Sequence, residues 1–401
     1  MKDFSAQTTA PHLQPAQLLA AVGGALNLAV AMGIGRYAFT PALALMQRDV
    51  GLGDAGAGLL ASFNYIGYLA GAVLAAHVPW RSRRPLFLCF LAVSVLTTGL
   101  MAAGSSFGFW LVLRTVSGLA SAFLFVLGSG MALDALPSDG HGAGILFCGV
   151  GCGIAVTGVL TPLGDGLGGW SAAWLVCAAA AVILALPAAA FLRVPARSAG
   201  TVAPGPADIR VPFRSLLVSY FCAGLGYIIT GTFLVVIVQR MPGAPAGGDF
   251  TWTLLGLTAV PSCPLWAAAG KRFGQERALI AAFLLHALGI ALPVLSDGPA
   301  ATFGGAALYG GTFMGIVLLT MALGKKALPG ATGKAVGWLT VVYGIGQILG
   351  PWLAGVVAER SGSFDLPLLG GAGIILVGAA PIALALTKKT RHSEQTAKTT
   401  G

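Results

Sequence analysis

The chain has 401 residues, of which 56% are hydrophobic and only 9% are charged, whereas soluble domains carry about 25% charged residues. A soluble globular protein of this length is therefore excluded. The formal net charge of +10 is compatible with nucleic acid or anionic lipid as a partner. The basic residues, however, lie in short segments between long apolar runs, which is the pattern of membrane topology and not of a nucleic-acid-binding protein.

Twelve apolar runs are long enough to cross a bilayer when the sequence is read in windows of about 19 residues. The first run is too long for a signal-peptide core and lacks a convincing small-residue cleavage site, so we expect it to be a membrane span. The prediction is an all-α integral membrane protein with twelve spans. They cover residues 17–46, 55–77, 85–104, 107–133, 142–164, 170–192, 213–239, 251–269, 277–296, 300–323, 334–357 and 366–387.

The connections between spans are short except for one proline-rich segment after span six. Such a composition favours a flexible linker. We therefore expect three parts: an N-terminal six-helix bundle over residues 1–192, a cytoplasmic linker over 193–212, and a C-terminal six-helix bundle with a short cytoplasmic tail over 213–401.

The distribution of basic residues predicts the orientation. If the N-terminus is inside, eighteen Lys and Arg fall in inner segments and three in outer ones, while Arg36 and Arg114 lie within spans. This bias places both termini in the cytoplasm. The expected location is the bacterial inner membrane, with the lipid bilayer as surroundings and a monomer as the unit.

The first span contains the most unusual stretch, Gly33–Pro41 (GIGRYAFTP). An arginine inside an apolar run costs roughly 2.5–3.5 kcal/mol on insertion scales and normally faces a partner or a water-filled cavity. Gly33 and Gly35 allow close approach of a neighbouring backbone, and Pro41 removes a helix hydrogen bond and bends the helix. The stretch predicts that Arg36 lies in the wall of a central cavity.

Arg114 on span four is expected at a similar membrane depth to Arg36. All thirteen carboxylates lie outside the spans or near span ends, with Asp134 closest to a span interior. Two intramembrane arginines without an intramembrane acid favour an organic anion, because arginine binds carboxylates bidentately. The alternative is that each arginine donates to backbone carbonyls and ties helices together. We favour substrate contact for Arg36 and a structural or gating role for Arg114.

Uncharged polar residues within the spans are further candidates, since they can orient a substrate in an apolar pocket. Tyr37 in the first span, Tyr227 in span seven and Gln347 in span eleven rank highest, although each is as compatible with an inter-helix hydrogen bond. His286 in span nine is a candidate for proton coupling, since histidine titrates near neutral pH. A lone histidine in a span is more often a helix-packing donor, so both interpretations stay open.

The two halves repeat at a nearly constant offset. Gly33–Arg36 (GIGR) matches Gly224–Tyr227 (GLGY) at an offset of 191, and Gly149–Gly151 matches Gly344–Gly346 at 195. Two further matches, at 192 and 193, fall between them in the same order. In folds built from such repeats the substrate site lies between the halves near the midplane.

Local motifs resemble the major facilitator superfamily over nearly the whole chain. Gly270–Leu279 (GKRFGQERAL) resembles the signature loop between spans eight and nine, without its opening aspartate, and Arg114–Gly118 resembles an R-x-x-x-G motif on span four. The resemblance implies structural or gating roles for Gly118, Arg272, Gly274 and Arg277. The stretch Gly33–Pro41 is similar to the YbfB/YjiJ-type branch of the superfamily.

The resemblance and the residues together favour a secondary transporter of a small organic anion, working by alternating access. Two alternatives remain: an exporter of amphipathic drugs or metabolites, and a transporter-like sensor that binds without translocating. An enzyme is not expected, since the spans hold no catalytic cluster. No cofactor or metal is expected either, because Cys148 and Cys152 have no histidine or carboxylate nearby in the sequence and are best explained as packing thiols.

Overall fold

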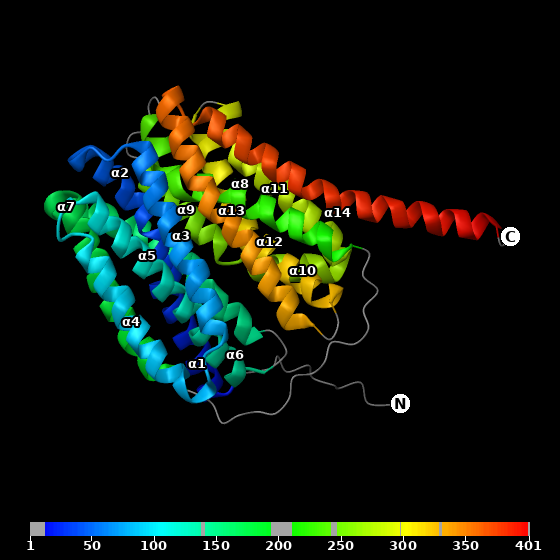
Figure 1. Ribbon diagram of the computed structural model, residues 1–401, viewed down its shortest axis with the longest axis horizontal. Coiled ribbons are helices and arrows are strands. Elements are labelled where there is room, and N and C mark those ends of the chain that lie inside the picture. Colours follow the sequence, from blue (N-terminus) through cyan, green and yellow to red (C-terminus); the bar gives the residue numbers. More distant parts are fainter. Residues whose placement is uncertain are drawn as a thin grey trace, which may run out of the picture.

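The computed structural model describes residues 13–137, 141–193, 211–241, 247–296, 298–328 and 331–399. Within these ranges the chain is helical, and none of the described residues forms a strand (Figure 1). The helices are α1 (Pro15–Leu28), η1 (Ala29–Tyr37), α2 (Phe39–Val50), α3 (Asp54–Ala76), η2 (Trp80–Ser82), α4 (Arg83–Leu100), α5 (Phe107–Phe123), η3 (Leu124–Gly128), α6 (Ser129–Ala135), α7 (His141–Phe191), α8 (Phe213–Arg240), α9 (Gly247–Ala259), α10 (Ser262–Phe273), α11 (Gln275–Leu295), α12 (Pro299–Ala327), α13 (Thr332–Ser361) and α14 (Asp365–Thr399).

These helices confirm the twelve predicted spans. Ten helices are long and apolar enough to cross a membrane, and α9 with α10, bent by 44° at a short break, form another crossing. α7 has 51 residues, but Gly169 has a φ of +71° and interrupts it, a backbone conformation that glycine adopts without strain. The break in α7 separates spans five and six, so the described chain crosses twelve times.

The boundaries of the two bundles and of the linker between them remain predictions. Residues 194–210, which make up most of the expected linker over 193–212, lie outside the described residues. In Figure 1 the helices of the first half gather on one side and those of the second half on the other, and α14 runs on beyond the bundle.

Spans one and seven are the most buried in the molecule. In the most apolar window of each, 72% of the residues of span one (α1, η1 and α2) and 89% of those of span seven (α8) are buried inside the protein. Other spans, such as α4 and α7, are largely exposed along their apolar faces, as helices in contact with lipid tails are. The buried central positions belong to the two helices that carry Arg36 and Tyr227.

The most extensive contacts between the halves join three pairs of spans: α3 with α13, α7 with α9, and α2 with α8. Figure 1 shows α3 beside α13. The Thr40 hydroxyl donates to the Gly231 carbonyl at 2.6 Å, and the Ser62 hydroxyl donates to the Ile348 carbonyl at 2.6 Å. These bonds satisfy polar groups across the interface without placing a charge in the apolar interior.

A charged network joins the halves where α2 and α8 end and α3 begins. The Arg240 guanidinium donates to both carboxylate oxygens of Asp54 at 2.8 Å, and Gln47 donates to the same carboxylate at 2.6 Å. The Glu359 carboxylate accepts the backbone N–H of Ala55 at 2.7 Å. A bidentate arginine–carboxylate pair supported by further hydrogen bonds has the geometry in which ion pairs contribute most. The network fastens spans one, two, seven and eleven together at this end of the bundle.

Within the first half, α3 and α5 pack backbone against backbone. A Cβ atom at Gly118 would lie 1.9 Å from the Asn64 carbonyl oxygen, and one at Gly67 would lie 1.9 Å from the Thr115 carbonyl oxygen. Glycine at both positions lets the two helices approach as closely as small-residue motifs permit in membranes. This contact gives Gly118 a structural reason to be glycine.

We expect Gly118→Ala to lower the free energy of unfolding by about 1–3 kcal/mol or more, since the obstructing atom is backbone and cannot rotate away. Gly108→Ala is the matched control, because it lies on the same helix and an added Cβ meets nothing within 4 Å. This control should be neutral or stabilising by up to about 1 kcal/mol. Thermal unfolding of the purified protein in detergent measures both, and equal effects would contradict the packing argument.

Candidate functional site

Arg36 lies in the π-helix η1 and is only 3% exposed. Its guanidinium carbon is 4.4 Å from the ring centroid of Tyr65, 4.3 Å from that of Tyr68 and 5.5 Å from that of Tyr37. Aromatic faces stabilise a desolvated cation by about 2 kcal/mol or more. The three tyrosines, here called the tyrosine cage, hold the charge in the centre of the protein.

The cage leaves part of the hydrogen-bonding capacity of Arg36 unused. The Nε and Nη2 atoms are buried and have no hydrogen-bond partner among the described residues. No aspartate or glutamate in the described ranges forms an ion pair with Arg36. Since a guanidinium carries five N–H donors in a fixed plane, the site presents unfilled donors and an uncompensated positive charge.

The backbone around Arg36 departs from the α-helix. Ala29–Tyr37 forms a π-helix of nine residues, a conformation that is rare and frequent at functional sites. Its hydrogen bonds join residues five apart, so its turns are wider than those of an α-helix.

Span four supplies donors to the carbonyl groups of η1. The Ser117 hydroxyl donates to the Gly35 carbonyl at 2.8 Å, and the Ser121 hydroxyl donates to the Ala31 carbonyl at 2.7 Å. These two hydroxyls, with Arg114, are spaced so that they share one face of α5. Span four therefore stabilises the wide turns that position Arg36.

Span one in turn donates a hydrogen bond to the irregular backbone of span four. A second π-helix, η3, interrupts span four, and Asn27 in α1 donates to the Leu124 carbonyl in η3 at 3.0 Å. A Cβ atom at Gly128 would lie 2.2 Å from the Asn27 amide nitrogen, so glycine makes room for this contact. Spans one and four thus each satisfy the irregular backbone of the other.

Arg114 is 2% exposed and contacts span one differently from Arg36. Its Nη2 atom lies 3.4 Å from the Arg36 carbonyl oxygen, and its guanidinium carbon lies 4.5 Å from the centroid of the Phe39 ring. Both contacts are with the backbone and side chains of span one. The geometry favours the structural interpretation of Arg114: it holds the carbonyl of the residue that carries the charge.

The remaining predicted residues of the first span have packing contacts. A Cβ atom at Gly33 would lie 2.3 Å from Gly153 in span five, and one at Gly35 would lie 2.8 Å from the Ser94 hydroxyl. Pro41 lies in the first turn of α2, where a missing N–H costs little. The chain changes from π to α geometry just before this proline.

In the second half, Tyr227 occupies the position equivalent to Arg36. Its hydroxyl accepts a hydrogen bond from the Gln347 amide, and its carbonyl accepts one from the Tyr309 hydroxyl at 2.8 Å. The Tyr227 ring is nearly parallel to those of Tyr343 and Phe313, at interplanar angles of 16° and 5°. Two of the predicted residues, Tyr227 and Gln347, therefore bond to each other within an aromatic cluster.

Tyr37 lies beside Arg36 and contacts the second half. Its ring centroid lies 6.3 Å from that of Trp252 in α9, across the interface between the halves. Arg36 lies over Tyr68 of α3, and α3 packs against α13, the helix that carries Gln347. The structure therefore brings together Arg36, Tyr37, Tyr227 and Gln347 at the middle of the molecule, with aromatic rings between them.

His286 lies beside the aromatic cluster and is fully buried. Its Nδ1 atom lies 2.7 Å from the Thr312 hydroxyl oxygen, and its ring centroid is 4.7 Å from that of Tyr309. The Nε2 atom has no partner among the described residues. His286 thus has one nitrogen engaged in helix packing and one free.

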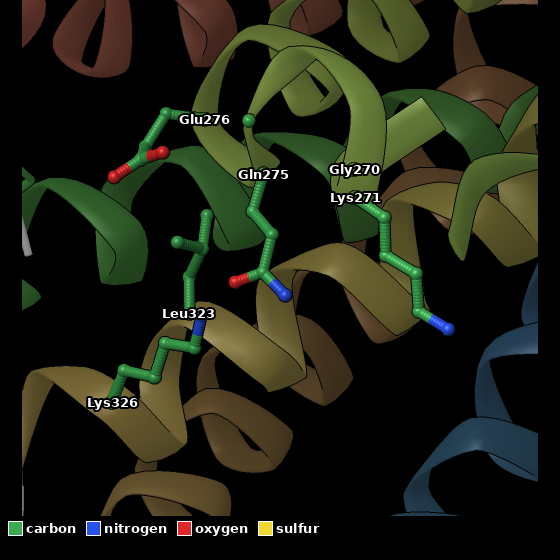
Figure 2. Close-up of a pocket in the computed structure, with 7 residues that line it drawn as sticks. Gly270, Lys271, Gln275, Glu276, Leu323 and Lys326 are labelled. Atoms are coloured by element: carbon green, nitrogen blue, oxygen red, sulfur yellow. The ribbon is translucent and has the colours of Figure 1, made fainter. Parts of the chain in front are cut away.

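The signature loop lies at the end of spans eight and nine, apart from the central residues. Gly274 joins α10 to α11 with a φ of +91°, whereas the Arg272 and Arg277 side chains are exposed. Gly270, Lys271, Gln275 and Lys326 are among the residues that line a cavity of about 320 Å³. Figure 2 shows Gln275 reaching from the start of α11 toward α12.

The equivalent loop of the first half fastens helices through arginine. Arg84 donates to the Leu192 and Ala189 carbonyls at the end of α7, the latter at 3.2 Å. Arg83 pairs with Asp134 at 3.4 Å. These bonds tie span three to spans four and six, although the loop lacks the aspartate of the superfamily signature.

Several residues of the site were not ranked highly by the sequence analysis. Tyr65, Tyr68 and Tyr343 contact the ranked residues directly, and so do Tyr309 and Trp252. The available signal was the recurrence of aromatic residues in spans that line the first and seventh helices. That signal does not say which ring faces inward.

Solved structures show the same fold. The chain superposes on a point mutant of the nucleoside transporter NupG with a TM-score of 0.74 at 15% identity, covering 92% of this chain and 99% of that one. A bacterial homologue of the human lysosomal transporter Spinster, in an inward-facing and unoccupied conformation, gives a TM-score of 0.64 at 16% identity, with 93% and 96% covered. The fold is therefore that of multi-span membrane transporters.

The sequence comparisons place the chain within that class. Residues 28–384 match the model of the family described as "Uncharacterised MFS-type transporter YbfB", and the chain belongs to this family of major facilitator superfamily transporters. The MFS-type transporter YtbD of Bacillus subtilis (strain 168) is 25% identical over 370 residues, which are 88% of this chain and 91% of YtbD. A 2-nitroimidazole transporter of Escherichia coli (strain K12) is 40% identical over 88 residues, 22% of each chain. The protein is a multi-pass membrane transporter of a small solute and not an enzyme.

We expect Ser121→Ala to lower the free energy of unfolding by about 0.6–1.7 kcal/mol, the range of hydrogen bonds between membrane helices, because the Ala31 carbonyl loses its donor. Ser129→Ala is the control: Ser129 is buried in the same span, but its hydroxyl has no partner among the described residues. That change should be neutral or stabilising. Thermal unfolding in detergent compares the two, and an unchanged midpoint for Ser121→Ala would rule out the supporting role of span four.

Proposed function

We propose that the protein carries a small organic anion, with Arg36 as the principal charge partner. The observation that carries the proposal is that Arg36 is buried at the centre of the fold with two unpartnered nitrogen atoms and no acidic partner among the described residues. A carboxylate fits these donors in a bidentate arrangement and supplies the missing negative charge. The tyrosine cage provides aromatic walls but no negative charge, so the cargo neutralises Arg36.

The alternative role for Arg36, a tie between helices, is less well supported. Arg114, Ser117 and Ser121 already donate to the carbonyls of η1. The buried Nε and Nη2 atoms of Arg36 bond to no backbone carbonyl of the described chain. A buried cation whose nitrogen atoms are not all used by the protein is typical of substrate and ion pathways.

We further propose that transport proceeds by alternating access between the two six-helix halves, in the bacterial inner membrane with both termini in the cytoplasm. The interface is built from close backbone contacts and single hydroxyl bonds, which can be exchanged when the halves rock. The network of Arg240, Asp54 and Glu359 fastens one end of that interface. A proton can accompany the cargo on the cargo's own carboxyl group, a route that needs no intramembrane acid.

A second candidate cargo comes from the partial match to the 2-nitroimidazole transporter. A nitroimidazole is a small flat ring, and its nitro group presents two oxygens in the same plane as a carboxylate does. Such a cargo suits the aromatic cluster and the donors of Arg36. The binding experiment should therefore include 2-nitroimidazole together with the anions. Amphipathic cations in the same experiment test the alternative of drug export.

Arg36→Gln should weaken binding of an anion by about a hundredfold, because two charge-assisted hydrogen bonds are lost at about 1.5 kcal/mol each. Calorimetric titration of purified protein against a panel of carboxylates, 2-nitroimidazole and amphipathic cations identifies the cargo, and flux into proteoliposomes distinguishes transport from mere binding. Arg360→Gln is the control, since that arginine is exposed at the end of α13 and should leave binding unchanged.

Each outcome of this titration decides between the candidates. Anion binding that survives Arg36→Gln would contradict the proposal, and cation binding alone would favour drug export. Binding of an anion without flux would identify a sensor.

A further inference from the structure

His286, whose Nε2 atom has no partner among the described residues, lines an aromatic space in the second half. The side chains around this space are those of Ala223, Tyr227, Phe313, Ile316, Tyr343 and Ile375. The space is too narrow to hold a water molecule in this conformation, so water does not satisfy the nitrogen. A buried polar atom without a partner is uncommon in native proteins and calls for an explanation.

The hydrogen bonds of Thr312 determine which proton His286 carries. The Thr312 hydroxyl oxygen lies 2.6 Å from the Leu308 carbonyl oxygen, a separation at which the hydroxyl proton must lie between them. A hydroxyl has a single proton, so at the 2.7 Å contact with His286 the Thr312 oxygen accepts and Nδ1 donates. In the neutral imidazole the other nitrogen, Nε2, is then an acceptor.

The walls of the space select a flat molecule. The rings of Tyr343 and Phe313 lie within 16° and 5° of parallel to Tyr227, at centroid distances of 5.5 and 6.3 Å. Parallel aromatic faces stack on a planar ring with about 0.5–1.5 kcal/mol beyond area burial. A ring that enters here by separating these side chains brings its edge toward Nε2.

We propose that His286 is a specificity residue that accepts a hydrogen bond from an N–H or O–H on the ring of a planar aromatic cargo. The acid group of that cargo lies toward Arg36, since Arg36 lies over Tyr68 of α3 and α3 packs against α13, the helix that carries Tyr343. The inference that the cargo carries an acid group rests on the proposed function. The inference that its ring carries a hydrogen-bond donor rests on His286 alone. The preferred cargo class is thus an aromatic acid with a hydrogen-bond donor on its ring.

The test uses probes that differ only in the donor. Purified full-length protein is titrated calorimetrically with 4-hydroxybenzoate and 4-fluorobenzoate, with 3-hydroxybenzoate and 3-fluorobenzoate, and with phenol and fluorobenzene. Fluorine is close to a hydroxyl in size but donates no hydrogen bond. We expect the hydroxyl member of at least one acid pair to bind ten times more tightly or better, since a site built around a buried polar group rejects the analogue that leaves it unpaired.

Three variants locate the effect. His286→Phe keeps a ring against Tyr309 and should abolish the preference while leaving the fluoro acids bound. Thr312→Val removes the partner that fixes the proton on Nδ1 and should reduce the preference. Thr320→Val is the matched control, because Thr320 is also buried in α12 and its hydroxyl has no partner among the described residues; it should keep the preference.

The outcomes separate this inference from the proposed function. Equal affinities within every pair, a preference that persists in His286→Phe, or no binding of any of the six probes would overturn the role of His286. Acids that bind equally but depend on Arg36 would leave the proposed function intact. A His286-dependent preference for phenol over fluorobenzene, without binding of any acid, would support His286 and contradict the organic anion.

Discussion

The rest of the structure depends on the burial of one positive charge in a bundle that offers it no acid. Arg36 is held by aromatic faces on spans one and two, and its backbone is held by hydroxyl groups of span four. Because cation–π contacts do not use up hydrogen-bond donors, this arrangement keeps a cation stable while some of its donors stay unfilled. A carboxylate partner in the protein would have stabilised the charge as well, but it would also have occupied the donors.

The two halves share a repeat and use it differently. At equivalent positions of the central helices, the first half places a cation and the second half places Tyr227 within stacked rings. The polar atoms of Tyr227 are bonded to Gln347 and Tyr309, so this side of the centre is mostly apolar. In the proposed function, this asymmetry assigns charge recognition to the first half and shape recognition to the second.

The sequence was sufficient for the fold and for the burial of Arg36 and Arg114. Twelve apolar runs and a basic bias define a membrane bundle, and an arginine in an apolar run is conspicuous because its burial is costly. The cost of burial singled out Arg36, and the repeat between the halves singled out Tyr227. The aromatic partners did not follow, since the direction in which tyrosines such as Tyr65 and Tyr309 point depends on helix packing. The pair between Arg240 and Asp54, 186 residues apart, and the π-helix η1 likewise have no local pattern that specifies them.

The π-helix has a consequence for how this span is compared with others. A wide turn takes up more residues than an α-helical turn, so the face on which Arg36 emerges differs from the face that a regular helix with the same residues would present. A helical wheel drawn from Pro15 onward therefore assigns the wrong neighbours to every residue after Ala29. A relative with one residue fewer in this stretch could keep each side chain of the motif and still direct its arginine toward another helix.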